Sequence, residues 1–422
     1  MIAYLSRNCL GVFAADESFR AEFNATEEQL SDVMTAFFLG YAIFQIPAGY
    51  LGQRFGSRVV LTLYALLWSA CTALLGLSSG LGLLTGAMFA NGLAQAGVFP
   101  NAARSIADWM PSHRKAIACG FMAAFMSIGG AAATALTGVL TKLSWSWQAI
   151  VFLYAVPGVV WAVVFCVWFR NRPEDHPQVT ESEVDWIRGR SEEGPIEDSV
   201  DDVPKESTIN WATMLRSKAL WLINGQQFFR AAGYIFCATW LPTYLRDQYG
   251  VSVGDAGLWS SLPLLAVVAG SSLGGIVTDL LLEHTGSRAI SRKAVAATCL
   301  TICGVLTVSA LGAKTIPVAV ALIGAGLFFA SLAGPCSYAQ TMDMAGSQIP
   351  VVFGMMNMMG NFGAALCPQL VTGTKDLTGS WDSVLYLFLG IYLAGALCWV
   401  LLDTDAVLES DDQQSTPSAT GH

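Results

Sequence analysis

The sequence predicts an all-α membrane protein with twelve transmembrane helices in two pseudo-symmetric six-helix bundles. Three observations predict it: an apolar composition, a series of apolar runs of membrane-spanning length, and one long hydrophilic segment in the middle of the chain. Of the 422 residues, 54% are hydrophobic and 13% are charged, and the mean hydropathy is +0.52. Soluble domains carry about 25% charged residues. The composition therefore favours a chain whose main solvent is a lipid bilayer.

The twelve predicted helices are runs of roughly 20 apolar residues, the length that crosses a bilayer. Charged or turn residues bound each run. The helices lie near residues 1–15, 31–51, 59–78, 81–104, 116–141, 148–169, 219–245, 255–282, 294–312, 315–339, 349–372 and 383–402.

The hydrophilic segment divides the chain into domains. We predict an N-terminal six-helix bundle over 1–169, a cytoplasmic linker over 170–218, a C-terminal six-helix bundle over 219–403, and a disordered acidic cytoplasmic tail over 404–422. Within the linker, Thr180 and Glu183 have the spacing of a capping box, which predicts a short surface helix.

Positive charge predicts the orientation, because Lys and Arg near helix ends stay cytoplasmic. With the N-terminus inside, 15 of the 22 basic residues fall in cytoplasmic loops and five in outer loops. Both termini are therefore predicted to be cytoplasmic. The chain is expected to be a monomer that crosses the cell membrane, the inner membrane of a bacterium, several times.

The first span is short for its task. A helix over Met1–Ala15 would reach about 22 Å at 1.5 Å per residue, less than the roughly 30 Å hydrocarbon core. We therefore expect the native helix to begin upstream of Met1. Finding Met1 as the first residue of the native protein by mass spectrometry would contradict this expectation.

Several functional classes have no support in the sequence. The ten Cys form no C-x-x-C pair and only four His are present, so neither a metal site nor a disulfide framework is indicated. A Walker-type loop, a nucleophile elbow and an H-E-x-x-H motif are all absent from the sequence. The acidic residues behind the net charge of −9 gather in the linker and the tail, which are solvated segments. We expect no enzymatic activity, no cofactor and no nucleic-acid partner.

A repeated motif relates the two halves. The loop after the second helix begins at Gly49 and ends in Gly56-Ser57-Arg58, and the segment after the eighth runs from Gly275 through Asp279 to Gly286-Ser287-Arg288. Both begin G-x-x-x-[Q/D] and end G-S-R at equivalent places. Such repeats are expected when the halves of a transporter are related by symmetry.

These segments resemble the loop signature of the major facilitator superfamily, G-x-L-a-D-R-x-G-x-R. The chain is most similar to the anion:cation symporter family within it, which includes sialin, the vesicular glutamate transporters and bacterial galactonate and hexuronate transporters. The resemblance extends over nearly the whole chain. Its motifs are Tyr4-Leu5-Ser6-Arg7, Phe37 to Pro47, Gly92 to Pro100, Trp240 to Leu245, and Asn357 with Asn361.

The resemblance implies a secondary or facilitative transporter of a small organic anion, such as an aldonate or hexuronate, that works by alternating access. It also implies gating roles for the loop residues, which are Gly49, Arg54, Gly56, Arg58, Asp279 and Arg288. The partners expected are the anionic substrate and the bilayer. A co-transported ion is left open.

Arginines inside predicted spans are the main site candidates, because a charge in a span costs at least about 2.5–3.5 kcal/mol. Arg7 falls where the family has an Arg that is implied to meet the substrate's carboxylate. A guanidinium stays charged when desolvated, and its planar fork matches two carboxylate oxygens. The alternative is an Arg7 that snorkels to the inner surface.

Arg230 lies about eleven residues into the seventh predicted helix, too deep to snorkel easily. No mid-helix Asp or Glu is available as its partner, so the substrate itself is the candidate. Backbone carbonyls and water in the lumen are the alternative. Because the first and seventh helices are equivalent in the two halves, Arg7 and Arg230 are predicted to clamp one anion across a central cavity.

Polar residues at helical spacing extend the predicted site. The pairs are Tyr4 with Arg7, Tyr41 with Gln45, Arg230 with Tyr234, and Asn357 with Asn361. The resemblance implies substrate contact at Tyr4, Tyr41 and Asn357. Hydrogen bonding between helices is the alternative for each.

The chain departs from the family at the positions of its implied proton relay. Ser6 stands in place of an Asp, Met88 in place of an Arg and Gln95 in place of a Glu. A carboxylate can take up and release a proton, whereas a serine or a carboxamide cannot. Proton coupling through these positions is therefore not expected, and uniport, exchange and symport through another site remain open. Gln53 likewise replaces the Asp of the first loop motif, which removes an ion-pair partner from that gate.

Two rival functions are kept. A transporter of a neutral or zwitterionic solute would hold Arg230 with lumen water, and carboxylates would then inhibit uptake no better than their amides. A ligand sensor without net transport would explain the missing carboxylates, and a flux assay in liposomes would reveal it.

Overall fold

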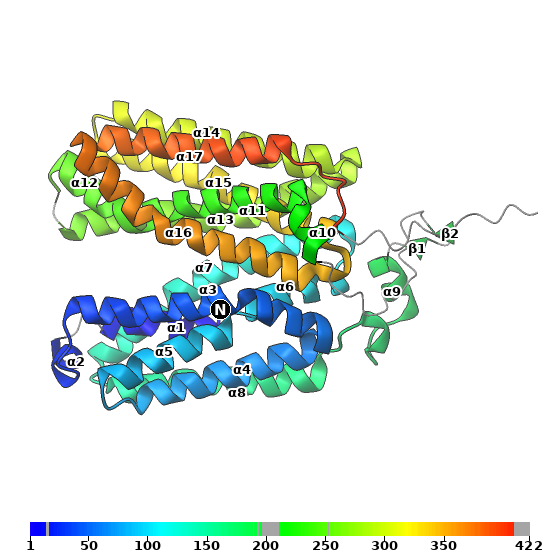
Figure 1. The fold of residues 1–422 in the computed structure, drawn as a ribbon, viewed down its shortest axis with the longest axis horizontal. Helices are drawn as coiled ribbons and strands as arrows, with labels where there is room; N and C mark the ends of the chain where they lie inside the picture. The colour runs from blue at the N-terminus through cyan, green and yellow to red at the C-terminus, as the bar shows by residue number, and fades with distance from the viewer. Residues whose placement is uncertain (14–16, 189, 192–193, 196–210, 252, 409–422) are drawn as a thin grey trace, which may run out of the picture.

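The computed structural model describes residues 1–13, 17–188, 190–191, 194–195, 211–251 and 253–408. Helices dominate these residues and form two bundles that lie along one long axis (Figure 1). Helices α1–α8 build the first bundle and α11–α17 build the second. The architecture is therefore all-α with two bundles, as the sequence predicts.

The first bundle contains the N-terminal helices. Its elements are α1 (Ala3–Phe13), α2 (Glu17–Glu22), α3 (Glu27–Phe55), α4 (Ser57–Gly76), α5 (Leu81–Gln95), α6 (Val98–Trp109), a 3-10 turn (Ser112–Arg114), α7 (Lys115–Lys142) and α8 (Trp147–Trp168). Thr26 caps α3 because its hydroxyl accepts a hydrogen bond from the Gln29 amide, and the Gln29 side-chain oxygen accepts one from the Thr26 amide. Gly56, at φ +81°, ends α3 and lets the chain reverse into α4.

The second bundle contains the C-terminal helices. Its elements are α11 (Lys218–Ile235), a π-helical segment (Phe236–Trp240), α12 (Leu241–Tyr249), α13 (Val253–Thr285), a second π-helical segment (Ala289–Ala294), α14 (Val295–Ser309), a 3-10 turn (Ala310–Gly312), α15 (Ile316–Ala345), a further 3-10 turn (Gly346–Gln348), α16 (Ile349–Thr378) and α17 (Trp381–Leu401). The first π segment divides the predicted helix 219–245. Pro242 has no amide hydrogen and its ring crowds the carbonyl one turn earlier, and a widened turn relieves this clash.

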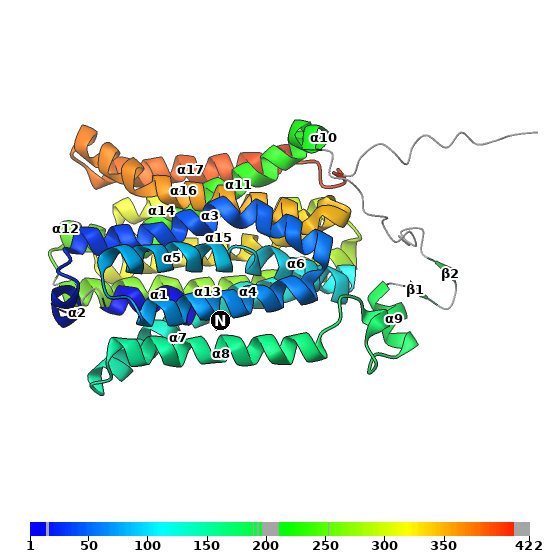
Figure 2. The same ribbon diagram turned by 60° about the horizontal axis from the view of Figure 1, so that its bottom comes forward.

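The linker contains short elements at one end of the bundles (Figure 2). They are a 3-10 turn (Pro173–Asp175), α9 (Glu181–Arg188), the antiparallel strands β1 (Arg190–Ser191) and β2 (Gly194–Pro195), and α10 (Trp211–Arg216). The predicted surface helix is confirmed as α9. Its capping box is present, because the Thr180 amide donates to Glu183 Oε2 at 2.8 Å and the Glu183 amide donates to Thr180 Oγ1 at 3.4 Å.

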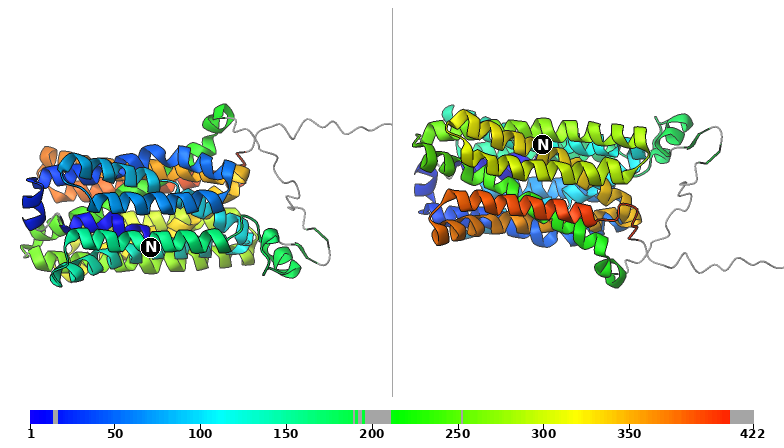
Figure 3. Two further views of the ribbon diagram at one scale, coloured as in Figure 1. Left: turned by 90° about the horizontal axis from the view of Figure 1, so that it is seen from below. Right: turned by 90° about the horizontal axis from the view of Figure 1, so that it is seen from above.

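Within the described residues, nine helical stretches are long and apolar enough to cross a membrane. One of them, Ile316–Thr378, contains both α15 and α16. The helices run close to parallel with the long axis, which Figure 3 shows from two opposite sides. The predicted first span corresponds to α1, which has 11 residues. A multi-pass helical membrane protein follows from these stretches, while the count of twelve spans stays a prediction.

The predicted tail begins at residue 404, but the first residues after α17 are packed. The Gln340 side chain donates to the carbonyl of Thr404 at 2.9 Å, and the Leu408 amide donates to the carbonyl of Met344 at 2.8 Å. Thr404 and Leu408 are both buried. The tail therefore starts later than predicted, and residues 409–422 lie outside the described residues.

Within each bundle, glycines bring two helices into close contact, and these pairs of helices are equivalent in the two bundles. A Cβ on Gly92 of α5 would lie 2.1 Å from the Phe37 carbonyl oxygen of α3. In the second bundle, a Cβ on Gly270 or Gly274 of α13 would lie 2.3 Å or 2.4 Å from a carbonyl oxygen of α15. Small residues permit this approach of backbones in a membrane, where packing replaces the hydrophobic effect.

The two bundles contact each other near the linker end, and the interface between them is called the seam below. A Cβ on Gly49 of α3 would lie 2.2 Å from the Pro350 carbonyl oxygen of α16, and one on Gly275 of α13 would lie 2.4 Å from the Ala116 carbonyl oxygen of α7. The ring of Phe99 on α6 packs on Tyr338 and Phe353 of the second bundle, with centroids 5.5 Å and 5.2 Å away. Gly49 and Gly275 therefore lie within helices where the two bundles meet, whereas the gating residue Gly56 lies in the turn between α3 and α4.

The glycine contacts predict a difference between two positions on α5. Replacing Gly92 with Ala places a methyl against the backbone of α3, and overpacking of this kind costs about 1–3 kcal/mol. Gly86→Ala is the matched control, because a Cβ there meets nothing within 4 Å. We expect Gly92→Ala to lower the unfolding temperature in detergent and Gly86→Ala to leave it unchanged or raise it, since Ala is the better helix former. Equal unfolding temperatures for the two variants would contradict the contact.

Candidate functional site

The Arg7 side chain lies among aromatic rings. Its guanidinium carbon is 5.3 Å from the ring centroid of Tyr4, 5.1 Å from those of Phe37 and Phe38, and 5.0 Å from that of Tyr41. A cation is attracted to an aromatic face at these distances. The rings come from α1 and α3 and fix the position of the charge without neutralising it.

A cavity of about 320 Å³ opens beside Arg7. It is lined by Arg7, Asn8, Gly11, Val12, Met34, Phe37, Phe38, Met88 and Thr134. All nine residues belong to the first bundle, on α1, α3, α5 and α7. Among the described residues that line this cavity, Arg7 is the one that carries a charge.

The Arg230 side chain, on α11, is held by neutral groups. Its Nε and Nη2 donate to the Gln227 side-chain oxygen at 3.3 Å and 3.0 Å, and Nη2 also donates to the Tyr338 hydroxyl at 3.4 Å. Within the described part of the chain, no carboxylate forms an ion pair with Arg7 or Arg230. Neutral partners orient the two charges, and no described acidic side chain neutralises either of them.

Tyr41 and Asn357 connect the two arginine environments across the bundles. The Asn357 side chain, on α16, donates to the Tyr41 hydroxyl of α3 at 3.1 Å. The Tyr41 ring also contacts the Arg7 guanidinium. The Tyr41 hydroxyl interacts electrostatically with Tyr338, and the Tyr338 hydroxyl accepts a hydrogen bond from Arg230. The predicted residues Tyr4, Arg7, Tyr41, Arg230 and Asn357 are therefore brought together at the seam.

Tyr234 also belongs to this cluster. It lies one turn after Arg230 on α11, within electrostatic range of both guanidinium groups and of Tyr4. Its side chain is 37% exposed.

Two predicted members take different positions. Gln45 is fully buried, its backbone packs against Gly354 of α16, and its side-chain amide has no hydrogen-bond partner among the described residues. Asn361 donates to the Asn357 carbonyl at 2.8 Å, one turn back on its own helix. The structure therefore does not bring Gln45 into contact with the arginine cluster.

Tyr338 and Gln227 were missed in the sequence analysis. Tyr338 lies in the long apolar helix α15 with no charged residue at helical spacing before it. Gln227 precedes Arg230 by three residues, a spacing that puts both on one face of α11 and that could have indicated it.

The predicted coupling positions form a neutral hydrogen-bonded group. The Gln95 side-chain nitrogen donates to the Ser6 hydroxyl at 3.1 Å and to the Asn91 side-chain oxygen at 3.0 Å. All three side chains are buried. An uncharged group therefore occupies the place next to Arg7 where the resemblance implies titratable residues.

Asp279, in the second loop motif, connects α13 of the second bundle to α7 of the first. Its two carboxylate oxygens accept hydrogen bonds from the Ala116 amide at 3.2 Å and the Ile117 amide at 2.6 Å, in the first turn of α7. Free amides and the helix dipole make a helix N-terminus a favourable place for a carboxylate. Asp279 was predicted on a gating loop, but it lies inside α13 and is almost fully buried.

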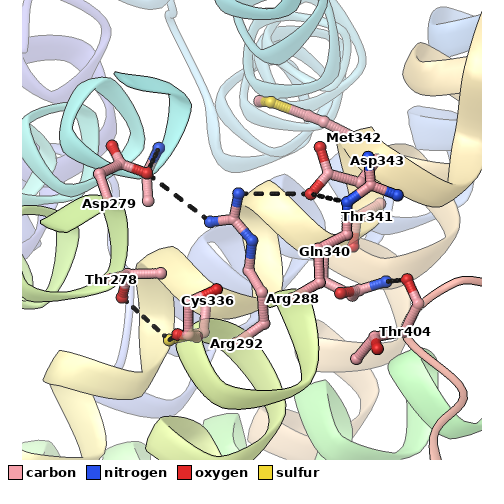
Figure 4. A network of polar contacts seen from close by, with 12 residues as sticks. Thr278, Asp279, Arg288, Arg292, Cys336, Gln340, Thr341, Met342, Asp343 and Thr404 are labelled. Carbon is pink, nitrogen blue, oxygen red and sulfur yellow. Dashed lines mark hydrogen bonds and ion pairs between the residues drawn. The ribbon is translucent and has the colours of Figure 1, made fainter. Parts of the chain in front are cut away.

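A buried ionic cluster supports Asp279 (Figure 4). Arg292 is fully buried, with Nη1 at 3.8 Å from Asp279 and Nη2 at 3.3 Å from Asp343 of α15. Arg288 lies 3.9 Å from Asp343 and is partly exposed. Arg292, one of the 15 basic residues predicted to lie in cytoplasmic loops, is instead the centre of an ion-pair network between α13 and α15, and no role was predicted for its partner Asp343.

The equivalent position in the first loop motif has no such interaction. Gln53 carries no charge, and its buried side-chain oxygen has no hydrogen-bond partner among the described residues. The residue that faces Gly49 is Pro350, which has no amide hydrogen to donate. The two gates are therefore chemically different although their glycines pack alike.

The two gating arginines of the first motif interact within their own bundle. Arg54 lies over the Phe55 ring at 5.5 Å. The Arg58 Nε donates to the Cys166 carbonyl of α8 at 2.7 Å. The Arg58 backbone amide donates to the Asn171 side-chain oxygen at 2.8 Å. Contact across the seam comes from Arg104 of α6, which donates to the Ser347 carbonyl at 3.0 Å.

Comparison with known proteins identifies relatives over nearly the full length. A family model described as Major Facilitator Superfamily matches residues 1–368 and 225–420. A probable sulfoacetate transporter of Cupriavidus necator is 28% identical over 98% of this chain and 94% of the relative. A D-galactonate transporter of Escherichia coli is 29% identical over 96% of this chain and 93% of the relative.

Solved structures share the fold. The structure of a proton:xylose symporter of the major facilitator superfamily superposes with a TM-score of 0.71 at 13% identity, over 97% of this chain and 96% of that chain. At this identity the likeness describes the fold alone.

The ionic cluster predicts a large effect of removing its central cation. Arg292→Met leaves Asp279 buried without a counter-charge and Asp343 with only the partly exposed Arg288, and breaking a buried pair in this way costs about 3–5 kcal/mol. Arg288→Met is the matched control, because Arg288 is partly exposed and Arg292 still pairs with Asp343. We expect a much lower unfolding temperature for Arg292→Met than for Arg288→Met in detergent. Similar temperatures would show that the cluster contributes little to stability.

Proposed function

Because this chain belongs to the Major Facilitator Superfamily, we propose that it carries small organic anions, sugar acids in particular, across a membrane by alternating access. The family is one of membrane carriers, and the chain is not an enzyme. The relatives are named as transporters of sulfoacetate and D-galactonate, which are both organic anions.

One observation supports the anionic substrate above the others. Two guanidinium groups, one from each bundle, lie at the seam with neutral neighbours. In a medium of low dielectric constant an unpaired charge is costly, so an anion that meets both groups gains more there than it would in water. Planar guanidinium groups also match the two oxygens of a carboxylate.

The same residues would also allow the bundles to move. Tyr41 and Asn357 hydrogen-bond across the seam beside both arginines, so a bound anion that competes for these groups would act on the contact between bundles. Transporters of this architecture bind their substrates near the middle of the bilayer, between the two repeats, and rock the halves around the site.

The finer topology is part of the proposal. We propose twelve spans, both termini in the cytoplasm, and a bacterial inner membrane as the location, with a monomer as the working unit. In this orientation the linker end faces the cytoplasm. The contacts of Gly49, Gly275 and Asp279 at that end support a substrate path that opens to the opposite side.

The neutral group of Ser6, Asn91 and Gln95 supports transport without proton movement at these positions. Uniport, exchange, and symport through another site are the coupling modes consistent with it. A proton gradient alone is therefore not expected to drive accumulation through this group.

Uptake by Arg230→Ala tests the proposal. Proteoliposomes that contain the wild type are expected to take up labelled D-galactonate or sulfoacetate. Arg230→Ala should insert normally but lose uptake by at least about tenfold, because a hydrogen bond to a charged group contributes about 1.5–3 kcal/mol. Arg246→Ala, at an exposed position of α12, is the control and should retain uptake. Retained uptake by Arg230→Ala would refute the clamp.

Competition by amides separates an anion site from a site for neutral solutes. The acid and the primary amide of one sugar acid have nearly the same shape but differ in charge. We expect the acid to inhibit uptake of its labelled form. The amide should need at least about a tenfold higher concentration for the same inhibition, because its neutral oxygen forms weaker hydrogen bonds to a guanidinium than a carboxylate does. Equal inhibition by the two compounds would support a neutral or zwitterionic substrate instead.

A further inference from the structure

The two bundles share a sequence pattern at the end that lies opposite the linker (Figure 1). Residues 141–147 lead from α7 into α8 and read T-K-L-S-W-S-W, and residues 375–381 lead from α16 into α17 and read K-D-L-T-G-S-W. A leucine, a serine and a tryptophan coincide in the two segments. Thr141 therefore stands in the first bundle where Lys375 stands in the second.

In the second bundle, this place holds a lysine ammonium. The Lys375 Nζ donates to Asp247 Oδ2 of α12 at 2.6 Å and lies 4.4 Å from the centroid of the Trp381 ring. The Trp381 indole nitrogen donates to the same carboxylate oxygen at 3.0 Å. A carboxylate that already accepts a hydrogen bond from an indole therefore still pairs with an ammonium, and the indole face adds a cation–π contact.

The first bundle repeats the carboxylate and the indole, with Thr141 in place of the lysine. The Trp147 indole nitrogen donates to Glu22 Oε2 at 2.8 Å, and the Gln148 side-chain nitrogen donates to Glu22 Oε1 at 3.0 Å. The Thr141 hydroxyl donates to the Thr137 carbonyl of its own helix at 2.9 Å. Each Glu22 oxygen keeps a further lone pair that can accept a hydrogen bond.

A cavity of about 240 Å³ lies at this place in the first bundle. It is lined by Phe13, Ser18, Phe19, Glu22, Thr141, Trp145, Ser146, Trp147 and Gln148. Among these described lining residues, Glu22 is the one that carries a charge. The cavity shares no lining residue with the cavity beside Arg7, so it is a separate site.

Aromatic rings fix the indole of this cavity. The centroid of the Trp147 ring lies 5.2 Å from that of Phe19 and 5.5 Å from that of Phe23. Both phenylalanines are buried, whereas Glu22 is exposed. A rigid indole face beside an accessible carboxylate attracts a cation through the ring quadrupole and through charge, and N–H groups on that cation can donate to the carboxylate.

We propose that this cavity binds a primary ammonium group, which takes the place that the Lys375 ammonium has in the second bundle. The ammonium pairs with Glu22 and lies over the Trp147 ring. A free amine and the amino head group of phosphatidylethanolamine share this chemistry. A free amine lacks the tether of a lysine side chain and loses more freedom on binding, so roughly millimolar concentrations are needed to fill the site.

Thermal unfolding of the full chain in detergent tests the site with ethanolamine, whose amino group is protonated at neutral pH. Ethylene glycol is the matched control, because it has a hydroxyl in place of the ammonium. We expect millimolar ethanolamine to raise the unfolding temperature of the wild type. Ethylene glycol and sodium chloride at the same concentration should leave it unchanged.

Three variants locate the response. Glu22→Gln keeps the size of the side chain and removes its charge, so half of the temperature shift should require at least about tenfold more ethanolamine. Thr141→Lys supplies the ammonium from the chain itself and should abolish the response. Lys375→Thr is the reverse change and should add a response at Asp247. Unfolding temperatures without ethanolamine verify that the variants fold.

Lipids distinguish the two sources of the ammonium. Phosphatidylethanolamine in the micelles should stabilise the wild type more than phosphatidylcholine does if a lipid head group is the ligand, and ethanolamine alone should suffice if it is a free amine. A wild type that neither ethanolamine nor phosphatidylethanolamine stabilises beyond the controls would overturn the proposal. An unchanged response in Glu22→Gln or in Thr141→Lys would also overturn it. Either result leaves the proposed transport of anions untouched, because the site belongs to the first bundle alone.

Discussion

An unneutralised guanidinium in a low-dielectric environment is the constraint on which this account depends. Insertion of an Arg into a membrane span is costly, and the cost is usually met by an acidic partner or by water. Arg7 is placed by aromatic rings and Arg230 by a carboxamide and a phenol, and no carboxylate among the described residues pairs with either. The fold holds these two charges at the seam of two bundles, where a mobile anion can neutralise them.

A second set of arginines shows the opposite solution. Arg292 is as deeply buried as any charged group described here, and two carboxylates lie beside it. One of these, Asp279, also accepts hydrogen bonds from the first turn of α7. The linker end therefore neutralises its charges internally and holds the bundles together, while the arginine cluster at the seam leaves its charges for a ligand.

The contrast between the two gates adds an asymmetry to a symmetric fold. Gly49 and Gly275 pack against the opposite bundle in nearly the same way. Asp279 adds a charged cap to the second contact, whereas neither Gln53 nor Pro350 carries a charge at the first, and Pro350 has no amide hydrogen to donate. Closure at the linker end therefore depends more on α13 and α7 than on α3 and α16.

The sequence predicted the bundles and much of the site because apolar runs, buried arginines and helical spacing are all local patterns. Gln45 shows the limit of spacing. Tyr41 and Gln45 both contact α16, but four residues advance a helix by about 6 Å and turn it about 40° beyond one full turn, and only Tyr41 also contacts Arg7. The pairing of Arg292 with Asp343 joins residues far apart in the chain, and Tyr338 reaches Arg230 from another helix. Such tertiary contacts leave no periodic trace.

The most direct measurement is an experimental structure of the protein with a bound sugar acid. The account predicts acidic oxygens within about 2.7–3.2 Å of guanidinium nitrogens of both Arg7 and Arg230, with the ligand between Tyr41 and Tyr234. A ligand bound elsewhere, or a carboxylate of the protein paired with either arginine in the occupied site, would contradict it.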